Sequence, residues 1–489
     1  MSRRDLKLAH ILWLSLAVGL AFRLCSAYFV YGPQALDDYK HGILPAYQWA
    51  MGEAIQLPDY RSFFLTWLLG WPIYVLNYFH IDQAISQVRV VYLELALISL
   101  LAWSGLRLYA QTFASRRFAL YTMVLLAIYP LMPFISTRAF GEAVALPLVL
   151  AGMTLAEAGR RGNSRQIGLF CVGLFLLGLA AFFRFQVGLL YLVYTAIFLF
   201  RKEWRFLGFS LLLGSLLLLM QAGVDLLSGR AIFSTLQEYV LVNEGGAAQY
   251  GVSPWYNTWV MVLALTLFPL SLGFVRELSW AWQRHWRLIL PLLVFILVHS
   301  LMPHKEERFM YPIVGLVLLL MSEVLAKARK RRFTRLIYKP FLGLICVVGL
   351  SITCFNNTQV GEIEPIAEIN MRFPQVVLID KKSLLSQSRI KDFFVRPPSA
   401  IVTTTDSLTA NLIDHTIEQQ PVWQAVGLLT ADLEVKTELE QVANSMTAKT
   451  NCGPIFTASN WTDALIYRMN PRHNQRRRPT WYVVCERKI

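Results

Sequence analysis

The sequence predicts an α-helical polytopic membrane protein with about eleven transmembrane helices and a small α/β domain at its C-terminus. Hydrophobic residues make up 55% of the 489 residues and charged residues only 16%, and the mean hydropathy is +0.45. This is more apolar surface than a soluble core can bury, so a membrane must solvate much of it. The net charge of +15 lies in short clusters between apolar runs, which favours membrane topology over nucleic-acid binding.

Each expected span is an apolar run near the length that a helix needs to cross a bilayer, about 17 to 25 residues. The first run lacks a small-residue cleavage site, so we expect a helix rather than a removable signal peptide. Residues 63–79 are interrupted by Gly70, Pro72 and Asn77, and we expect a juxtamembrane or re-entrant segment there. The expected spans lie near residues 8–29, 88–106, 118–135, 139–157, 166–183, 187–200, 206–224, 258–275, 288–303, 309–326 and 340–355.

Basic residues predict the orientation of these spans. The N-terminus and alternate loops carry 22 Arg and Lys residues, whereas the opposite loops carry 8. Basic residues are enriched in cytoplasmic loops, so we expect the N-terminus to be cytoplasmic. An odd number of spans then divides the chain into a membrane domain, residues 1–355, and a periplasmic or lumenal domain, residues 356–489.

The C-terminal region alternates short β-like runs with helix-like polar stretches, a pattern typical of a small α/β domain. We expect strands at residues 376–379, 400–404 and 481–485 and a helix at residues 437–446. Two cysteines of this region, Cys452 and Cys485, are expected to form a disulfide if the domain is exported to an oxidising compartment.

The first outer loop, about residues 30–87, carries two adjacent carboxylates, Asp37 and Asp38, directly after the first span. One carboxylate at this place could act as a general base on an acceptor hydroxyl. Asp37 is the first candidate and Asp38 the second. The alternative is that both cap a juxtamembrane helix by accepting hydrogen bonds from its free N–H groups.

A second charged cluster follows the ninth expected span, in the run His304-Lys305-Glu306-Glu307-Arg308-Phe309. Lys305 and Arg308, with His304, could neutralise a phosphate, and Glu306 or Glu307 could orient them. If the tenth helix begins near Lys305, positions 305 and 308 share one face of it. The alternative is a cluster of interfacial side chains that extend to water without binding a ligand.

Further polar and aromatic residues of the outer loops belong to the same candidate site. Arg138 and Arg184 are candidate phosphate ligands, and Arg23, within the first span, is expected to face the same cavity. The alternative for each is a membrane-interface anchor. The candidates for orienting the site or binding the acceptor, besides Glu306, are Glu142, Tyr250, Trp255 and Tyr256.

Several familiar signatures are absent from the sequence, including a phosphate-binding Gly-Lys-Ser/Thr loop, a dinucleotide glycine pattern and zinc-like Cys/His spacing. We therefore expect no ATP or NAD chemistry, no cofactor and no metal. No cytoplasmic loop has room for a nucleotide-sugar-binding domain, so an activated sugar would have to arrive on a lipid.

Together these motifs resemble the GT-C mannosyltransferases of glycosyltransferase family 22, over about residues 8–355. The His304 to Phe309 element is the most specific part. The resemblance implies a polyprenyl-phosphate-linked hexose donor, expected to be mannose, an inverting transfer to a lipid-linked glycan or glycolipid, and Asp37 as the family's first-loop acid. Asp38 stands where the family usually has Glu and Ser253 where it often has His, so acceptor recognition is expected to differ.

Two other readings stay open. A transporter would be expected to show inverted repeats with sites at the membrane midplane, whereas the candidates here gather at one surface. A related GT-C enzyme could instead move another sugar, with lipid A or a protein as acceptor. A bacterial inner membrane, with the site facing the periplasm, is the favoured location. The Asn-x-Thr sequons at Asn356 and Asn460 keep the lumen of the endoplasmic reticulum as the alternative.

Overall fold

The computed structural model groups the chain into two compact units, which are described separately. The bundle unit comprises residues 1–27, 57–68 and 92–355, and the sheet unit comprises residues 28–56, 69–91 and 356–489. The structure describes residues 3–32, 37–113, 116–162, 166–246, 251–266, 268, 270–328, 334–373, 375–381, 393–394, 400–403, 424–445, 450–471 and 474–487.

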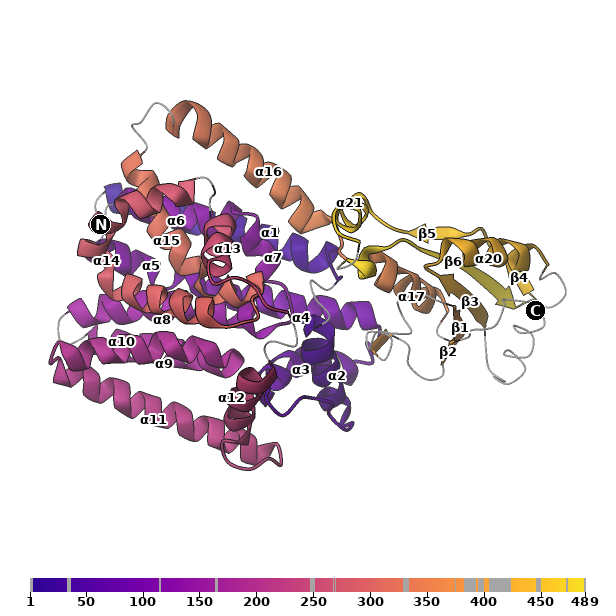
Figure 1. Cartoon of the computed structure of the whole chain (residues 1–489), viewed down its shortest axis with the longest axis horizontal. Helices are drawn as coiled ribbons and strands as arrows, with labels where there is room; N and C mark the ends of the chain where they lie inside the picture. Colours follow the sequence, from indigo (N-terminus) through magenta and orange to yellow (C-terminus); the bar gives the residue numbers. More distant parts are fainter. Residues whose placement is uncertain are drawn as a thin grey trace. The chain divides into compact units, whose positions relative to one another are not determined.

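The bundle unit is built almost entirely of helices (Figure 1). Among the described residues it also contains the short helical turns η2 (Ser99–Trp103), η4 (Phe185–Val187), η6 (Glu307–Met310) and η7 (Thr334–Tyr338). The helices are α1 (Arg3–Phe29), α4 (Ala84–Ile98), α5 (Leu106–Phe113), α6 (Arg116–Ile128), α7 (Leu131–Ile135), α8 (Gly141–Arg161), α9 (Ile167–Phe183), α10 (Gly188–Phe200), α11 (Trp204–Leu227), α12 (Ser234–Gly246), α13 (Asn257–Leu265), α14 (Leu270–Leu301), α15 (Tyr311–Ala328) and α16 (Lys339–Phe355).

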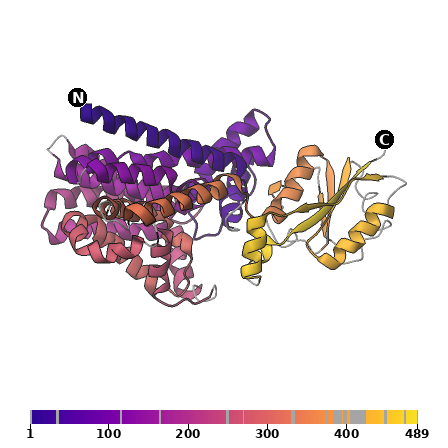
Figure 2. The same ribbon diagram turned by 90° about the horizontal axis from the view of Figure 1, so that it is seen from above.

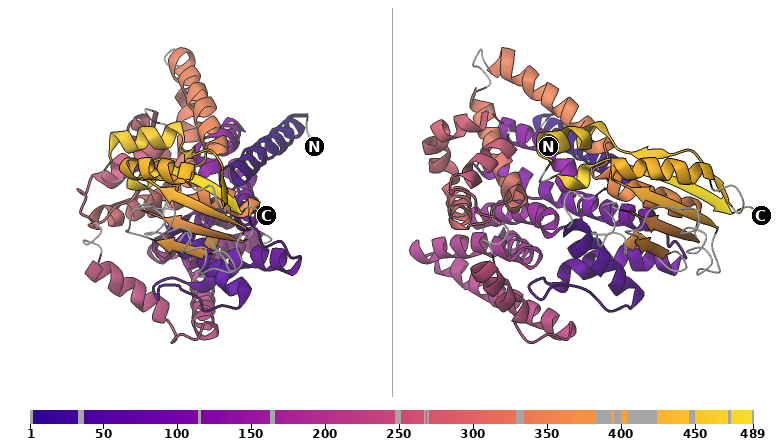
Figure 3. Two further views of the ribbon diagram at one scale, coloured as in Figure 1. Left: turned by 90° about the vertical axis from the view of Figure 1, so that its right-hand side faces the viewer. Right: turned by 45° about the vertical axis from the view of Figure 1, so that its right-hand side comes forward.

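Helix α8 forms the centre of the bundle unit. The apolar stretch of this helix is entirely buried, and the helix packs against α9, α15 and α5. Helices α11 and α16 lie at the edge of the bundle, as both views of Figure 3 show for the orange α16. Only 28% of the apolar stretch of α11 and 17% of that of α16 is buried, so the rest of each helix surface is left for lipid. A helix that is apolar on every side and buried only on one is typical of a membrane protein.

Helices occupy all of the expected spans within the described residues, and seven of them are long and apolar enough to cross a membrane. Two more apolar helices, α9 and α10, are shorter. Between the spans expected at residues 258–275 and 288–303, the helical segment α14 has a kink at His285, where two helices meet and the backbone angles are not helical. The re-entrant segment expected at residues 63–79 is a helix, α3 (Phe63–Tyr78), with Pro72 inside it.

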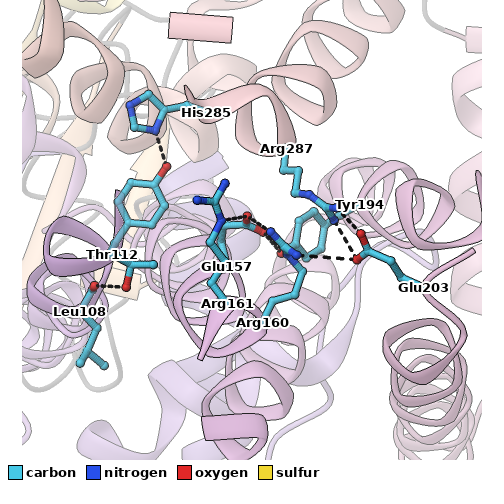
Figure 4. Close-up of polar contacts among 10 residues, drawn as sticks. Leu108, Thr112, Glu157, Arg160, Arg161, Tyr194, Glu203, His285 and Arg287 are labelled. Carbon is cyan, nitrogen blue, oxygen red and sulfur yellow. Dashed lines mark hydrogen bonds and ion pairs between the residues drawn. The ribbon is translucent and has the colours of Figure 1, made fainter. Parts of the chain in front are cut away.

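An ion-pair network joins helices at the end of α8 that carries Glu157 (Figure 4). Glu157 is 2% exposed and accepts hydrogen bonds from Arg160, at 2.7 and 3.0 Å, and from the Tyr194 hydroxyl, at 2.8 Å. Arg287 of α14 pairs with Glu203, which also lies 3.8 Å from Arg160. These arginines, which mark the cytoplasmic side in the sequence, therefore also link α8, α10 and α14 through the buried carboxylate of Glu157 and the partly exposed one of Glu203.

The sheet unit combines part of the first outer loop with the C-terminal domain. The loop part contains a short π-helical turn, η1 (Asp38–Ile43), and α2 (Leu44–Met51), where Trp49 packs against Trp71 of α3 with ring centroids 5.6 Å apart. The C-terminal elements are α17 (Val360–Arg372), β1 (Val376–Asp380), β2 (Ala400–Thr403), β3 (Ala425–Thr430), α20 (Leu433–Ser445), β4 (Thr450–Cys452), β5 (Phe456–Ala458), α21 (Trp461–Met469) and β6 (Thr480–Arg487).

The C-terminal sheet has helices on both faces, as Figure 2 shows for α17 and α20. Its strand order is β2-β1-β3-β6-β4, with β5 paired to β6, and only the β1 pairings with β2 and β3 are parallel. Val435 and Leu439 of α20 join the core on one face, and Ile369 of α17 lies against Gly427 on the other. The predicted strands correspond to β1, β2 and β6, and the predicted helix to α20.

The predicted disulfide is confirmed. Cys452 and Cys485 are register partners on the antiparallel strands β4 and β6, with Cα atoms 3.9 Å apart, and their sulfurs are bonded. The other cysteines, Cys25, Cys171 and two buried ones in α16, are free. The bridge fixes the edge strand β4 to the long strand β6.

Candidate active site

In the bundle unit, Glu142 and Arg184 form a buried ion pair. Glu142 lies in the first turn of α8, and Arg184 directly follows the end of α9. The Arg184 Nε lies 3.1 Å from a Glu142 carboxylate oxygen, with side chains only 8% and 2% exposed. The two helices approach closely because residue 141 is glycine: a Cβ there would lie 2.1 Å from the Phe183 carbonyl oxygen. Nothing in the sequence indicated that these two candidate residues pair with each other.

Phe309 connects this pair with the second charged cluster. The guanidinium carbons of Arg184 and Arg308 lie 5.0 and 5.7 Å from the centre of its ring, within the range of cation–π attraction. Its carbonyl accepts a hydrogen bond from the Gln186 amide at 3.3 Å, and the Tyr239 hydroxyl lies 3.4 Å from the Gln186 carbonyl oxygen. Arg184 and Arg308, far apart in sequence, therefore share one aromatic ring.

Glu306 holds the two side chains on either side of it, those of His304 and Arg308. One of its carboxylate oxygens lies 2.7 Å from Nε2 of His304, and the other accepts a short hydrogen bond from Arg308. Burial would raise the pKa of the Glu306 carboxyl, but the charge of Arg308 and the hydrogen bonds from Arg308 and His304 offset it, so this pKa lies below its usual range. Glu306 is thus an ionised partner that orients both side chains, whereas the neighbouring Glu307 is exposed.

Lys305 and Arg308 have different partners. Its ammonium donates to the carbonyl of Ser253, at 2.9 Å, and to that of Met302. Helix α15 begins only at Tyr311, after a 3-10 turn at Glu307–Met310, so the expectation that positions 305 and 308 share a helical face is wrong. Partial burial lowers the pKa of Lys305. Among the described residues, the ammonium is in contact with no carboxylate.

The loop before α13 lies beside the charged cluster. The Ser253 N–H donates to the Pro303 carbonyl at 3.0 Å, and the Ser253 carbonyl accepts from Lys305, as described above. Trp255 and Tyr256 follow, 65% and 54% exposed, with ring centroids 6.1 Å apart. Both rings are therefore available to an acceptor or to lipid. Tyr250 lies outside the described residues.

Two arginines are more deeply enclosed than the sequence suggests. Arg138 is fully buried, with its guanidinium 5.1 and 4.8 Å from the rings of Tyr92 and Phe134. Arg23 is 1% exposed and donates to Ser136 and to the carbonyl of Leu126. The expectation that Arg23 faces a ligand cavity is wrong, because these contacts hold its guanidinium against the turn that precedes Arg138.

In the sheet unit, the two adjacent carboxylates have different surroundings. Asp38 is completely buried, whereas the Asp37 side chain is 26% exposed. Nε2 of His41, one helical turn later, lies 3.5 Å from a carboxylate oxygen of Asp37. The Asp37 side chain makes no capping hydrogen bond at the start of η1, which disfavours the helix-capping alternative for this residue.

Sequence reasoning missed three residues that the structure adds. His41 stands four positions after Asp37, a spacing that places two side chains on one helical face, so its contact was predictable. Phe309 stood in the sequence motif without a role of its own, and Tyr239 gave no local signal. Their roles depend on contacts with Arg184 and Gln186.

Comparisons with known proteins show the family of this chain. A model of the Alg9-like mannosyltransferase family matches residues 15–381. Alpha-1,2-mannosyltransferase ALG9 of Saccharomyces cerevisiae is 41% identical over 76 residues, which are 16% of this chain and 13% of that protein. GPI mannosyltransferase 3 of Debaryomyces hansenii is 24% identical over 354 residues, 67% of this chain and 61% of that protein. The chain thus spans less than two thirds of the length of either relative.

A solved structure shares the whole fold. ArnT from Cupriavidus metallidurans, bound to undecaprenyl phosphate, matches with a TM-score of 0.59 and 13% identity, over 96% of this chain and 97% of that one. This likeness confirms the predicted fold, a bundle of membrane helices followed by a small C-terminal sheet domain.

Proposed function

Because the chain belongs to the Alg9-like mannosyltransferase family, we propose that it transfers mannose from a polyprenyl phosphate donor to a hydroxyl of a lipid-linked glycan or glycolipid. The transfer inverts the configuration at the sugar C1 and takes place at the outer face of the membrane. The observation that carries the proposal is the cluster of cations around Phe309 and Ser253, with Lys305 in contact with no carboxylate among the described residues.

The donor phosphate is bound by this cluster. Among the described residues, the positive charge of Lys305 is held by carbonyl groups alone, and Arg308, oriented by Glu306, presents a planar fork of N–H donors. Arg184 adds a third cation on the other side of Phe309, although Glu142 balances its charge. The structure of ArnT bound to undecaprenyl phosphate supports a polyprenyl phosphate as the lipid, because that protein has the same fold.

The general base is Asp37, with Asp38 as the second candidate. A base must reach the acceptor hydroxyl, and the side chain of Asp37 is partly exposed whereas that of Asp38 is enclosed. His41 lies close enough to orient the Asp37 carboxylate. The adjacent pair thus divides into one residue suited to substrate contact and one suited to packing.

The reaction then needs one proton transfer and one displacement. The Asp37 carboxylate takes the proton of the acceptor hydroxyl while that oxygen attacks the sugar C1. The bond between C1 and the phosphate oxygen breaks, and polyprenyl phosphate leaves with the electron pair. Its growing negative charge is stabilised by Lys305, Arg308 and Arg184, and stabilisation of developing charge is usually the largest catalytic contribution.

Purified protein in lipid nanodiscs, supplied with radiolabelled polyprenyl-phosphate-mannose and a panel of acceptor lipids, tests this function. We expect label to move to a lipid-linked glycan or glycolipid from this donor and not from GDP-mannose. The Asp37→Asn variant should lose about 10²- to 10⁴-fold in rate, as is common when a general base is removed, and should keep its donor affinity. Transfer only from a nucleotide sugar, or only from a polyprenyl phosphate carrying another sugar, would overturn the assignment.

A further inference from the structure

The C-terminal domain makes two sets of contacts with the loop that carries Asp37, within the sheet unit. One lies before Asp37, at Gly32, and the other after it, at Tyr39 and Tyr47. Both use side chains of the C-terminal domain, a region for which the sequence gave no role. Asp37 is thus placed between two fixed points.

The contact before Asp37 is polar and very close. The Gly32 N–H donates to the side-chain oxygen of Asn357 at 2.6 Å. A Cβ at residue 32 would lie 1.9 Å from the Thr358 carbonyl oxygen, so only glycine permits this approach. Asn357 is itself held, because its carbonyl accepts a hydrogen bond from the Asn460 side chain at 2.6 Å.

The contact after Asp37 is aromatic. The Tyr39 ring lies 6.0 Å from the ring of Phe393 and 5.7 Å from that of Phe394, and Phe393 also packs edge-on against Tyr47 at 5.6 Å. Phe393 is completely buried, and Phe394 and Tyr39 are 3% and 1% exposed. Pairs of this geometry contribute beyond their buried area, so this cluster fixes η1 firmly.

Hydrogen bonds join the aromatic contact to helix α17 and to the segment before Asp37. The Phe394 carbonyl accepts a hydrogen bond from the Asn370 side chain of α17 at 2.7 Å. The Tyr39 hydroxyl donates to the Tyr31 carbonyl at 2.8 Å, which joins the segments on the two sides of Asp37. A displacement of Phe393 and Phe394 would therefore be transmitted through Tyr39 to the turn that begins one residue after Asp37.

We propose that the C-terminal domain positions the carboxylate of Asp37 for catalysis through the packing of Phe393 and Phe394 on Tyr39. This inference rests on the proposed role of Asp37 as the general base. The two phenylalanines are positioning residues, since they contact the base-bearing turn and no reacting atom. A misplacement of about 1 Å in a catalytic group can cost about 10²-fold in rate.

The test compares Phe394→Ala with a control substitution of another phenylalanine in the same domain, Phe456→Ala. Phe456 stacks on Tyr482 at 5.5 Å, on β5, and is 38% exposed. We expect Phe394→Ala to lower kcat about 10²-fold with a change of less than about threefold in affinity for polyprenyl phosphate. Phe394→Leu should recover part of kcat, and Phe456→Ala should match the wild type. Equal kcat for Phe394→Ala and Phe456→Ala would overturn the proposal.

A second measurement follows the position of residue 37 without using activity. In a background without the four free cysteines, Asp37→Cys is labelled with a maleimide. Phe394→Ala should change the labelling rate and Phe456→Ala should leave it unchanged; equal rates in all three would refute the positioning role. If Asp37→Asn keeps full activity while Phe394→Ala changes the labelling rate, the base assignment fails but the structural coupling stands, so the two failures are distinguishable.

Discussion

Replacing Glu142 with glutamine decides whether Arg184 binds the donor phosphate or is only half of a structural ion pair. Glutamine preserves the shape of the side chain but removes the charge that lies 3.1 Å from Arg184. Breaking a buried ion pair by removing one partner costs about 3–5 kcal/mol, because the other charge stays buried and uncompensated. Glu142→Gln should therefore lower the free energy of unfolding by about 3–5 kcal/mol. The double variant, Glu142→Gln with Arg184→Met, should recover most of this lost stability.

Polyprenyl phosphate separates the two roles. A ligand at a hundredfold excess over its Kd stabilises the folded state by about 2.7 kcal/mol. If Arg184 binds the phosphate, the lipid supplies the missing anion and should raise the unfolding temperature of Glu142→Gln at least as much as that of the wild type. Arg184→Met should respond less. Thermal unfolding of the detergent-solubilised protein, followed by tryptophan fluorescence with and without the lipid, measures both effects.

Glu157→Gln is the matched control for this experiment. Glu157 lies on the same helix as Glu142, about 22 Å further along the helix axis at 1.5 Å per residue. Its side chain is 3% exposed and pairs with Arg160. Its replacement should cost a similar free energy but leave the response to polyprenyl phosphate as in the wild type. The reasoning is refuted if Arg184→Met is stabilised by the lipid as strongly as the wild type, or if Glu142→Gln costs less than about 1 kcal/mol.

Three further predictions use other parts of the chain. Arg308→Ala should weaken polyprenyl phosphate binding about 10- to 150-fold, the equivalent of about 1.5–3 kcal/mol for a charged hydrogen bond. Arg308→Lys should recover only part of the affinity, because the planar fork of the guanidinium is lost. A titration that gives equal affinities for the wild type and both variants would contradict this prediction. A membrane-impermeant maleimide should label Ser459→Cys in intact cells and Thr112→Cys only after permeabilisation, and the reverse pattern would invert the proposed topology. Reduction of the bridge between Cys452 and Cys485, whose separation in sequence is 33 residues, should cost the C-terminal domain about 3–4 kcal/mol in urea unfolding, and an unchanged midpoint would show that β4 is held by other contacts.

The C-terminal elements show which features a single sequence can predict. Strands β1 and β6 were predictable because both are runs rich in valine and isoleucine or aromatic residues. Strand β3 was missed: its six residues, Ala-Val-Gly-Leu-Leu-Thr, contain a glycine and no alternation, and a short apolar run of this kind does not distinguish strand from helix. Helix α17 was missed as well, since Pro365 interrupts its pattern.

The candidate site was predictable in its residue types but not in its geometry. The cluster from His304 to Arg308 is visible in the sequence because charged residues are rare beside apolar spans. The directions of Lys305 and Arg308 were not, since the Lys305 ammonium is held by Ser253, about fifty positions earlier, and the following helix starts only at Tyr311. A local periodicity argument cannot include a partner from another loop.

The two ends of α8 explain why a charge near the bilayer surface is by itself weak support for a ligand site. At one end, Arg160, Arg284 and Arg287 each have a carboxylate partner, and these ion pairs account for their presence without a ligand. At the other end, Glu142 balances Arg184, but Lys305 contacts only carbonyl groups among the described residues. An ammonium held by dipoles alone keeps its full charge for an anion. The case for a phosphate site therefore depends on the difference in partners rather than on the number of cations, a difference that composition cannot reveal.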